Sequence, residues 1–160
     1  MFEIKNKITL NVILVFSIFA LIVAYFIEYL LKHEPCNLCL IERIPYILSI
    51  IIISICLFLK KFEKITFILL TIIFIAGAFV SFYHFGIEKG FFEESFLCNL
   101  SNEINILTKE DLLKELQKKI ISCKNVDFTI FGLSLASINT IASIVLSTIT
   151  FKKYLNYEKN

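Results

Sequence analysis

The sequence has few of the residues that interrupt regular structure and few charged ones. Among its 160 residues there are 4 Gly, 2 Pro and no Trp, and only 19% of the residues are charged. The low glycine and proline content excludes a collagen-like fibre, and the 58% hydrophobic content excludes a disordered chain. The net charge of +2 comes from scattered lysines, which gives nucleic acid no basic patch to bind. With 17 Phe and a mean hydropathy of +0.80, a globule of this size could not cover its apolar surface, which indicates a membrane protein.

Four apolar stretches are long enough to cross a bilayer as helices, which takes about 20 residues. They cover residues 8–31, 38–59, 65–83 and 128–151. Their apolar residues run continuously instead of alternating, which disfavours membrane strands. The first stretch exceeds a signal-peptide core and no A-x-A site follows it, so we expect it to remain in the mature chain. The expected fold class is an all-α membrane protein, with residues 1–160 forming a single four-transmembrane-helix bundle.

Basic residues predict the orientation of this bundle, because cytoplasmic segments carry an excess of Lys and Arg. Closely spaced lysines lie in the N-terminus, in the link between the second and third stretches and in the C-terminus: Lys5, Lys7, Lys60, Lys61, Lys64, Lys152, Lys153 and Lys159. The loop over residues 84–127 mixes lysines with acidic residues instead. We therefore expect both termini to be cytoplasmic, and the first link and the long loop to lie outside.

A short amphipathic helix is expected within the long loop. The run Thr108-Lys109-Glu110-Asp111 resembles a capping box. The apolar residues that follow share one helical stripe: Leu112, Leu113, Leu116 and Ile120. This helix either lies on the outer membrane surface or packs against the bundle.

The expected topology divides the five cysteines. Cys36 and Cys39 form a C-x-x-C motif at the outer mouth of the second stretch, Cys98 and Cys123 lie in the outer loop, and Cys56 is expected to be a small buried hydrophobe. Disulfides persist on an oxidising face, so three interpretations of the outer four are open. They form two redox disulfides, Cys36–Cys39 and Cys98–Cys123, or two permanent staples, or a four-thiolate zinc site. We favour the redox interpretation, because a C-x-x-C bridge closes a tiny loop and zinc sites usually have two close pairs.

The C-x-x-C motif has a setting that suits thiol chemistry. Pro35 favours a helix start, and Cys36, Cys39 and Arg43 then share one helical face. A helix N-terminus favours a thiolate, and Arg43 could reach a thiolate or a ligand oxygen. The alternative is that Arg43 pairs with Glu42 or with a lipid phosphate. A membrane quinone is the natural two-electron acceptor for a dithiol at this interface, since the chain has no motif for a soluble nucleotide.

These residues carry a family resemblance. The run His33-Glu34-Pro35-Cys36-Asn37-Leu38-Cys39-Leu40-Ile41-Glu42-Arg43 resembles the signature of the bacterial disulfide bond formation protein B (DsbB) family. The likeness extends over the whole chain, from the four helices to the second cysteine pair. It implies an enzyme of the bacterial inner membrane that reoxidises a periplasmic DsbA-like protein of the thioredoxin fold. It also implies ubiquinone or menaquinone as electron acceptor, with no metal.

The resemblance implies a role for each outer cysteine. Cys98 resembles the family cysteine that the reduced partner attacks. Cys123 resembles its bridge partner, which then exchanges with Cys36. Cys39 resembles the cysteine beside the quinone, whose thiolate donates electrons to the ring.

Arg43 matches the family arginine that binds and polarises the quinone, and His84 resembles the histidine near the quinone site. The alternative for His84 is an interfacial histidine without a ligand, and Glu88 receives no role. The approach Lys32-His33-Glu34 is more charged than a plain apolar entry, and Phe128 could stand where a Trp is lacking. The main alternative function is a non-catalytic membrane protein whose disulfide-stapled outer loop binds a partner.

Overall fold

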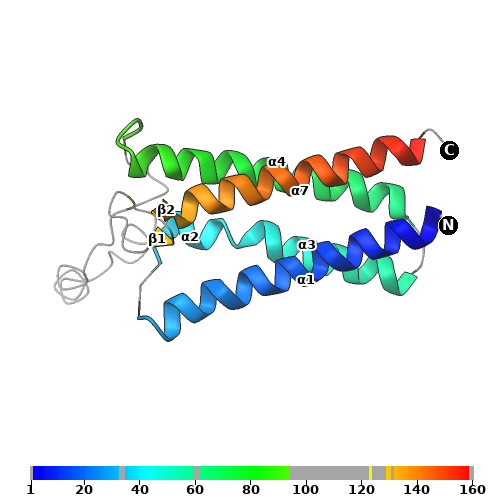
Figure 1. Ribbon diagram of the computed structural model, residues 1–160, viewed down its shortest axis with the longest axis horizontal. Helices are drawn as coiled ribbons and strands as arrows, with labels where there is room; N and C mark the ends of the chain where they lie inside the picture. Colours follow the sequence, from blue (N-terminus) through cyan, green and yellow to red (C-terminus); the bar gives the residue numbers. More distant parts are fainter. Residues whose placement is uncertain are drawn as a thin grey trace, which may run out of the picture.

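A computed structural model describes residues 2–32, 35–59, 62–93, 123, 129–130 and 132–158. Four long helices run side by side in it (Figure 1). They are α1 (Phe2–Tyr29), α3 (Ile44–Leu59), α4 (Glu63–Glu88) and α7 (Leu135–Glu158). A short helix α2 (Asn37–Ile41) precedes α3, and strands β1 (Thr129–Ile130) and β2 (Leu133–Ser134) precede α7.

Four helical segments are long and apolar enough to cross a membrane, as the sequence predicted. They are Asn6–Tyr29, Asn37–Leu59, Glu63–Glu88 and Leu135–Asn156. The second segment consists of α2 and α3 together, with a break of the helix at Glu42 and Arg43. Pro45 lies in the first turn of α3, where its missing N–H is not needed for a helical hydrogen bond. The expectation of an all-α protein with four such helices is confirmed.

Several helix boundaries differ from the sequence-based expectation, and two of them lie at the end of the bundle that carries the C-x-x-C motif. The last helix begins at Leu135 instead of residue 128, because Thr129 pairs with Ser134 and Ile130 with Leu133 in an antiparallel hairpin. Gly132 has a φ of +80°, a conformation that glycine adopts without steric cost and that a tight hairpin turn requires. Helix α4 continues past the expected end at residue 83 to Glu88. The amphipathic helix expected after Thr108, and Phe128, lie outside the described residues.

The helices form two pairs that pack against each other. Helix α4 makes its main contacts with α7, α1 packs on α3, and α3 contacts α4 to join the pairs. The core between them is apolar and includes Leu10, Ile53, Phe67, Leu70 and Phe74. Both termini lie at one end of the bundle, whereas α2 and the hairpin lie at the other (Figure 1). The helix pairing therefore brings the start of the second span close to the end of α4.

Small polar side chains also lie between the helices, and apolar side chains cover the outside. The hydroxyl oxygens of Ser17 and Ser49 are 2.9 Å apart, and so are those of Thr71 and Thr150. Large apolar side chains such as Phe58, which is 87% exposed, face outward. Helices in lipid associate in this way, through small polar residues and close packing.

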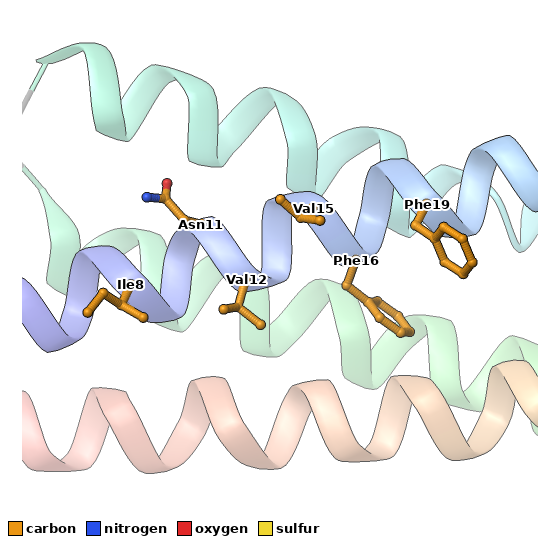
Figure 2. Close-up of a pocket in the computed structure, with 6 residues that line it drawn as sticks. All are labelled: Ile8, Asn11, Val12, Val15, Phe16 and Phe19. Atoms are coloured by element: carbon orange, nitrogen blue, oxygen red, sulfur yellow. The ribbon is translucent and has the colours of Figure 1, made fainter.

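An open apolar hollow runs along the middle of α1 (Figure 2). It is lined by Ile8, Asn11, Val12, Val15, Phe16 and Phe19. Most of these side chains are exposed, as expected for a surface that faces lipid.

Gly77 allows three helices to approach closely. A Cβ atom added at Gly77 would lie 3.0 Å from Cγ and 3.3 Å from Cβ of Pro45 on α3, and 3.6 Å from Oγ of Ser143 on α7. The proline ring cannot rotate away from such a contact. Gly77 therefore sets the separation of α3 and α4.

We expect Gly77→Leu to lower the free energy of unfolding by about 1–3 kcal/mol or more, because overpacking forces the helices apart. Thermal unfolding of the detergent-solubilised protein measures the effect. Ala76→Leu is the matched control, since Ala76 is the exposed neighbour on the same helix. Equal midpoints for the two variants would contradict the proposed close approach.

Candidate functional site

Cys36 and Cys39 begin helix α2 with their sulfur atoms in contact. Cys36 is the N-cap residue of α2, and its Sγ accepts a hydrogen bond from the backbone N–H of Cys39 at 3.4 Å. The two Sγ atoms are 2.9 Å apart, as a hydrogen-bonded dithiol. Cys36 is buried and Cys39 is half-buried. The pair is thus held at the helix start, which is the local setting that the C-x-x-C spacing after Pro35 predicted.

His84 lies beside this pair, from the far end of α4. Its Nε2 is 3.5 Å from Cys36 Sγ, and its Nδ1 is 2.7 Å from Oε1 of Glu42. The histidine is only 3% exposed. A carboxylate on one ring nitrogen fixes the orientation of the imidazole and turns the other nitrogen toward the sulfur. His84, Glu42 and Cys36 therefore form a chain of contacts that can hold or move a proton at the Cys36 sulfur.

Asn139 on α7 completes the surroundings of Glu42. Its Nδ2 donates to Oε2 of Glu42 at 2.9 Å and is 2.7 Å from Oγ of Ser81. Tyr46 donates its hydroxyl hydrogen to Oδ1 of Asn139. The amide thus links the α2–α3 junction with α4 and α7. Both carboxyl oxygens of Glu42 are occupied, by His84 on one side and by Asn139 on the other.

Cys123 also belongs to this site. It is 2% exposed and clusters with Cys36, Leu38 and Ile87. A hydrogen bond with the Cys123 thiol lowers the pKa of the Cys36 thiol, and hydrogen bonds with Cys39 and His84 lower this pKa further. Burial acts in the opposite direction and raises it, but the hydrogen bonds outweigh burial. The neighbours of Cys36 therefore stabilise its thiolate.

Arg43 points toward α1 and pairs there with an acidic residue. Its Nη1 donates to Oε2 of Glu28 at 2.5 Å, and its guanidinium lies over the ring of Tyr25, 4.9 Å from the centroid. The partners that the sequence left open for Arg43 were a thiolate, a ligand oxygen, Glu42 and a lipid phosphate. Glu42 is instead engaged by His84. The ion pair joins α1 to the α2–α3 junction and satisfies a charge that would otherwise be costly near the hydrocarbon.

The remaining candidates from the sequence are spread more widely. Cys98 lies outside the described residues, so its relation to Cys123 stays an expectation. Cys56 is 5% exposed in the apolar core, far along α3 from the site. Glu88, which received no role, has its Oε1 3.9 Å from Nε2 of His84.

Ligand atoms of Cys36, Cys39 and His84 lie within 4.8 Å of one another, close enough to hold a metal ion.

Sequence reasoning missed the polar residues that surround the C-x-x-C motif. Glu42 was considered only as a partner for Arg43, and Asn139, Ser81 and Tyr46 were not considered. Each of them is polar within an apolar span, which is the signal that could have found them, because polar groups in a membrane segment need partners. The sequence does not tell which helix supplies the partner.

We expect Asn139→Ala to lower the free energy of unfolding by about 1–3 kcal/mol, because Glu42 would lose a donor in a buried position. Unfolding of the detergent-solubilised variant by heat or denaturant measures the loss. Thr148→Ala, on the exposed face of the same helix, serves as control. An unfolding midpoint of Asn139→Ala as high as that of Thr148→Ala would show that the Asn139 side chain does not stabilise the fold.

Comparison with known proteins agrees with the motif. The chain matches the family model for disulfide bond formation protein DsbB over residues 6–152. It is 32% identical over 144 residues to the uncharacterized protein RP370 of Rickettsia prowazekii (strain Madrid E), an alignment that covers 89% of this chain and 84% of the relative. No solved structure matches the chain. With four membrane-spanning helices, a C-x-x-C motif at the start of the second span and a family match over nearly its whole length, this chain belongs to the DsbB family of disulfide bond formation proteins.

Proposed function

We propose that this chain is a protein dithiol:quinone oxidoreductase of the bacterial inner membrane. It reoxidises a periplasmic DsbA-like protein of the thioredoxin fold and passes the electrons through two cysteine pairs to a membrane quinone. Membership of the DsbB family supports an oxidoreductase role in disulfide formation. The observation that carries the finer proposal is the cluster of three cysteines, in which Cys36 is in contact with both Cys39 and Cys123.

The proposed relay starts at the loop disulfide between Cys98 and Cys123. A thiolate of the reduced partner attacks Cys98, and Cys123 leaves as a thiolate. Cys123 then attacks Cys36 of the Cys36–Cys39 disulfide, and Cys39 leaves as a thiolate. The second thiolate of the partner then attacks the partner's sulfur in the mixed disulfide with Cys98. This step releases Cys98 as a thiolate and leaves the partner oxidised. Cys98 attacks Cys123 to close the loop disulfide again, which leaves Cys36 and Cys39 as a dithiol with two electrons gained.

His84 and Glu42 serve the sulfur of Cys36 in this sequence. The attack on Cys36 breaks its bond to Cys39, and the final step releases Cys36 as a thiolate. Hydrogen bonds from neighbouring groups stabilise that thiolate and make Cys36 a good leaving group. The imidazole of His84 is within reach to supply or take the proton at Cys36, while Glu42 holds the ring.

A bound quinone would supply the acceptor for the two electrons and two protons that Cys36 and Cys39 give up when they close to a disulfide. The residues around Cys39 fit such a ligand. Arg43 offers guanidinium donors, and Tyr25, whose ring lies under the guanidinium, is 43% exposed. Cys39 is half-buried, whereas Cys36 and Cys123 are buried. Glu28 orients the guanidinium of Arg43 through the ion pair. A membrane quinone would approach this side from the bilayer, without crossing the protein core.

The bundle supports the proposed orientation. Both termini lie at one end and the cysteine cluster lies at the other (Figure 1). If the lysine-rich termini are cytoplasmic, the cysteines face the periplasm, where the thiol partner would be found.

We expect Cys39→Ala to reduce quinone reduction to the background rate, because no thiol remains to complete the disulfide with Cys36. The assay uses detergent-solubilised protein and a reduced thioredoxin-fold dithiol, and follows quinone absorbance. Cys56→Ser is the matched control and should turn over nearly as fast as the native chain. If native protein with intact disulfides reduces no quinone, the stapled, non-catalytic alternative is favoured.

We expect Arg43→Ala to raise the apparent KM for quinone by about 10–100-fold, because it removes charged hydrogen-bond donors. The rate of thiol exchange with the protein partner should change much less. Steady-state kinetics with each substrate varied in turn separate the two effects. Glu28→Gln is the informative comparison, since it removes the partner of the ion pair and keeps the guanidinium. Loss of the partner step alone in Arg43→Ala would place the arginine elsewhere in the mechanism.

A further inference from the structure

We propose that the reduced chain binds a thiophilic metal ion such as Zn²⁺ between Cys36, Cys39 and His84, and that the bound ion withholds the dithiol from oxidation. This ion is a competing ligand of the reduced state and not a resident cofactor. The proposal does not depend on quinone reduction. It rests on the positions of two thiols, one imidazole and the groups that hold the imidazole.

The three ligand atoms are already close to the spacing that zinc requires. They lie within 4.8 Å of one another, with 2.9 Å between the two Sγ atoms and 3.5 Å between Cys36 Sγ and His84 Nε2. Bonds of about 2.3 Å to sulfur and 2.0 Å to nitrogen, in tetrahedral geometry, separate ligand atoms by about 3.3–3.8 Å. The two Sγ atoms, now 2.9 Å apart, would have to separate further to bind one ion. A rotation of the half-buried Cys39 side chain would provide this separation.

The second and independent observation is the support of the histidine. Metal-bound histidines usually donate their other ring N–H to a carboxylate, which fixes the tautomer that leaves the ligating nitrogen unprotonated. His84 has this arrangement, with Nδ1 2.7 Å from Glu42 and Nε2 toward the sulfur. Asn139 in turn holds Glu42 by a hydrogen bond of 2.9 Å. Cys36, Cys39 and Glu42 belong to α2 and its caps, whereas His84 lies on α4 and Asn139 on α7, so the three helices already meet at the site.

The binding step involves no electron transfer. Zn²⁺ replaces the thiol protons of Cys36 and Cys39, so that two protons are released as two Zn–S bonds and one bond to His84 form. The fourth position is left to water or to Cys123, which packs against Cys36. Both sulfurs are then committed to the metal. A disulfide between Cys36 and Cys39 and a bound ion therefore exclude each other.

The test uses the full chain in detergent, reduced with a phosphine that is then removed, and titrated with Co²⁺ as a spectroscopic probe. We expect one Co²⁺ per chain, with the intense visible bands of tetrahedral cobalt–thiolate coordination, and displacement of Co²⁺ by Zn²⁺. The same chain with its disulfides closed should give no bands. Equal binding by the oxidised chain, or no bands from reduced and folded protein, would overturn the proposal. This comparison needs no mutation, so a failure to fold cannot mimic either result.

Variants then assign the ligands. We expect the bands to be lost in Cys39→Ser and in His84→Ala, and Glu42→Gln to bind with about 10–100-fold lower affinity, because it weakens only the support of the histidine. Cys56→Ser is the control and should bind as the native chain does. Loss of binding in Cys98→Ser would assign the metal to the loop cysteines and overturn the proposed site. Circular dichroism verifies that each variant is folded.

The blocking effect has its own measurement. Zn²⁺ should slow the reaction of the reduced chain with a small aromatic disulfide, and a chelator should restore the rate. Unchanged thiol reactivity in a chain that binds metal would show that the ion does not withhold the dithiol. Since no quinone is present, these results stand whether or not the chain reduces quinone.

Discussion

Glu42 is 8% exposed, and its two carboxyl oxygens face His84 on α4 and Asn139 on α7. A carboxylate in such a position is stable only when every element around it supplies a partner, because desolvation would otherwise cost several kcal/mol. The other parts of this end of the bundle follow from that constraint. Helix α2 gives way to α3 at Glu42, α4 continues far enough to present His84, and α7 must begin early enough to place Asn139 opposite. The orientation of the imidazole toward Cys36 is then a consequence of satisfying Glu42.

The four spans were predictable, because a continuous apolar stretch of this length is rarely stable except as a helix in lipid, and a lipid environment favours each of them in the same way. The helix start at Cys36 was also predictable from the local pattern after Pro35. The beginning of α7 was not, since the residues from Thr129 to Ser134 are as apolar as a span. What ends the helix there is a pairing of backbone groups across Gly132, and hydropathy carries no information about such pairing.

The sequence predicted the cysteines of the site, but it did not predict most of the polar residues that surround them. A C-x-x-C motif is local, whereas the partner of Arg43 comes from a separate helix. Glu28 is the single charged residue within the expected first span, residues 8–31. Its ion pair with Arg43, however, depends on the packing of α1 against the α2–α3 junction. Asn139 gave even less signal, because one amide in a long apolar helix can face any neighbour. Such contacts become visible only when the packing of α3, α4 and α7 is known.

The Sγ atom of Cys36 has two roles. Its Sγ accepts the N–H of Cys39 and so caps α2, and the same sulfur is the one that its neighbours favour as a thiolate. A thiolate is a strong hydrogen-bond acceptor and a sulfur within a disulfide is a weak one. The first turn of α2 is therefore held by this hydrogen bond when Cys36 is reduced, and most strongly when it is ionised, whereas a disulfide between Cys36 and Cys39 would hold the same turn by a covalent link. In this chain the oxidation state of a single atom decides which kind of bond secures a helix start.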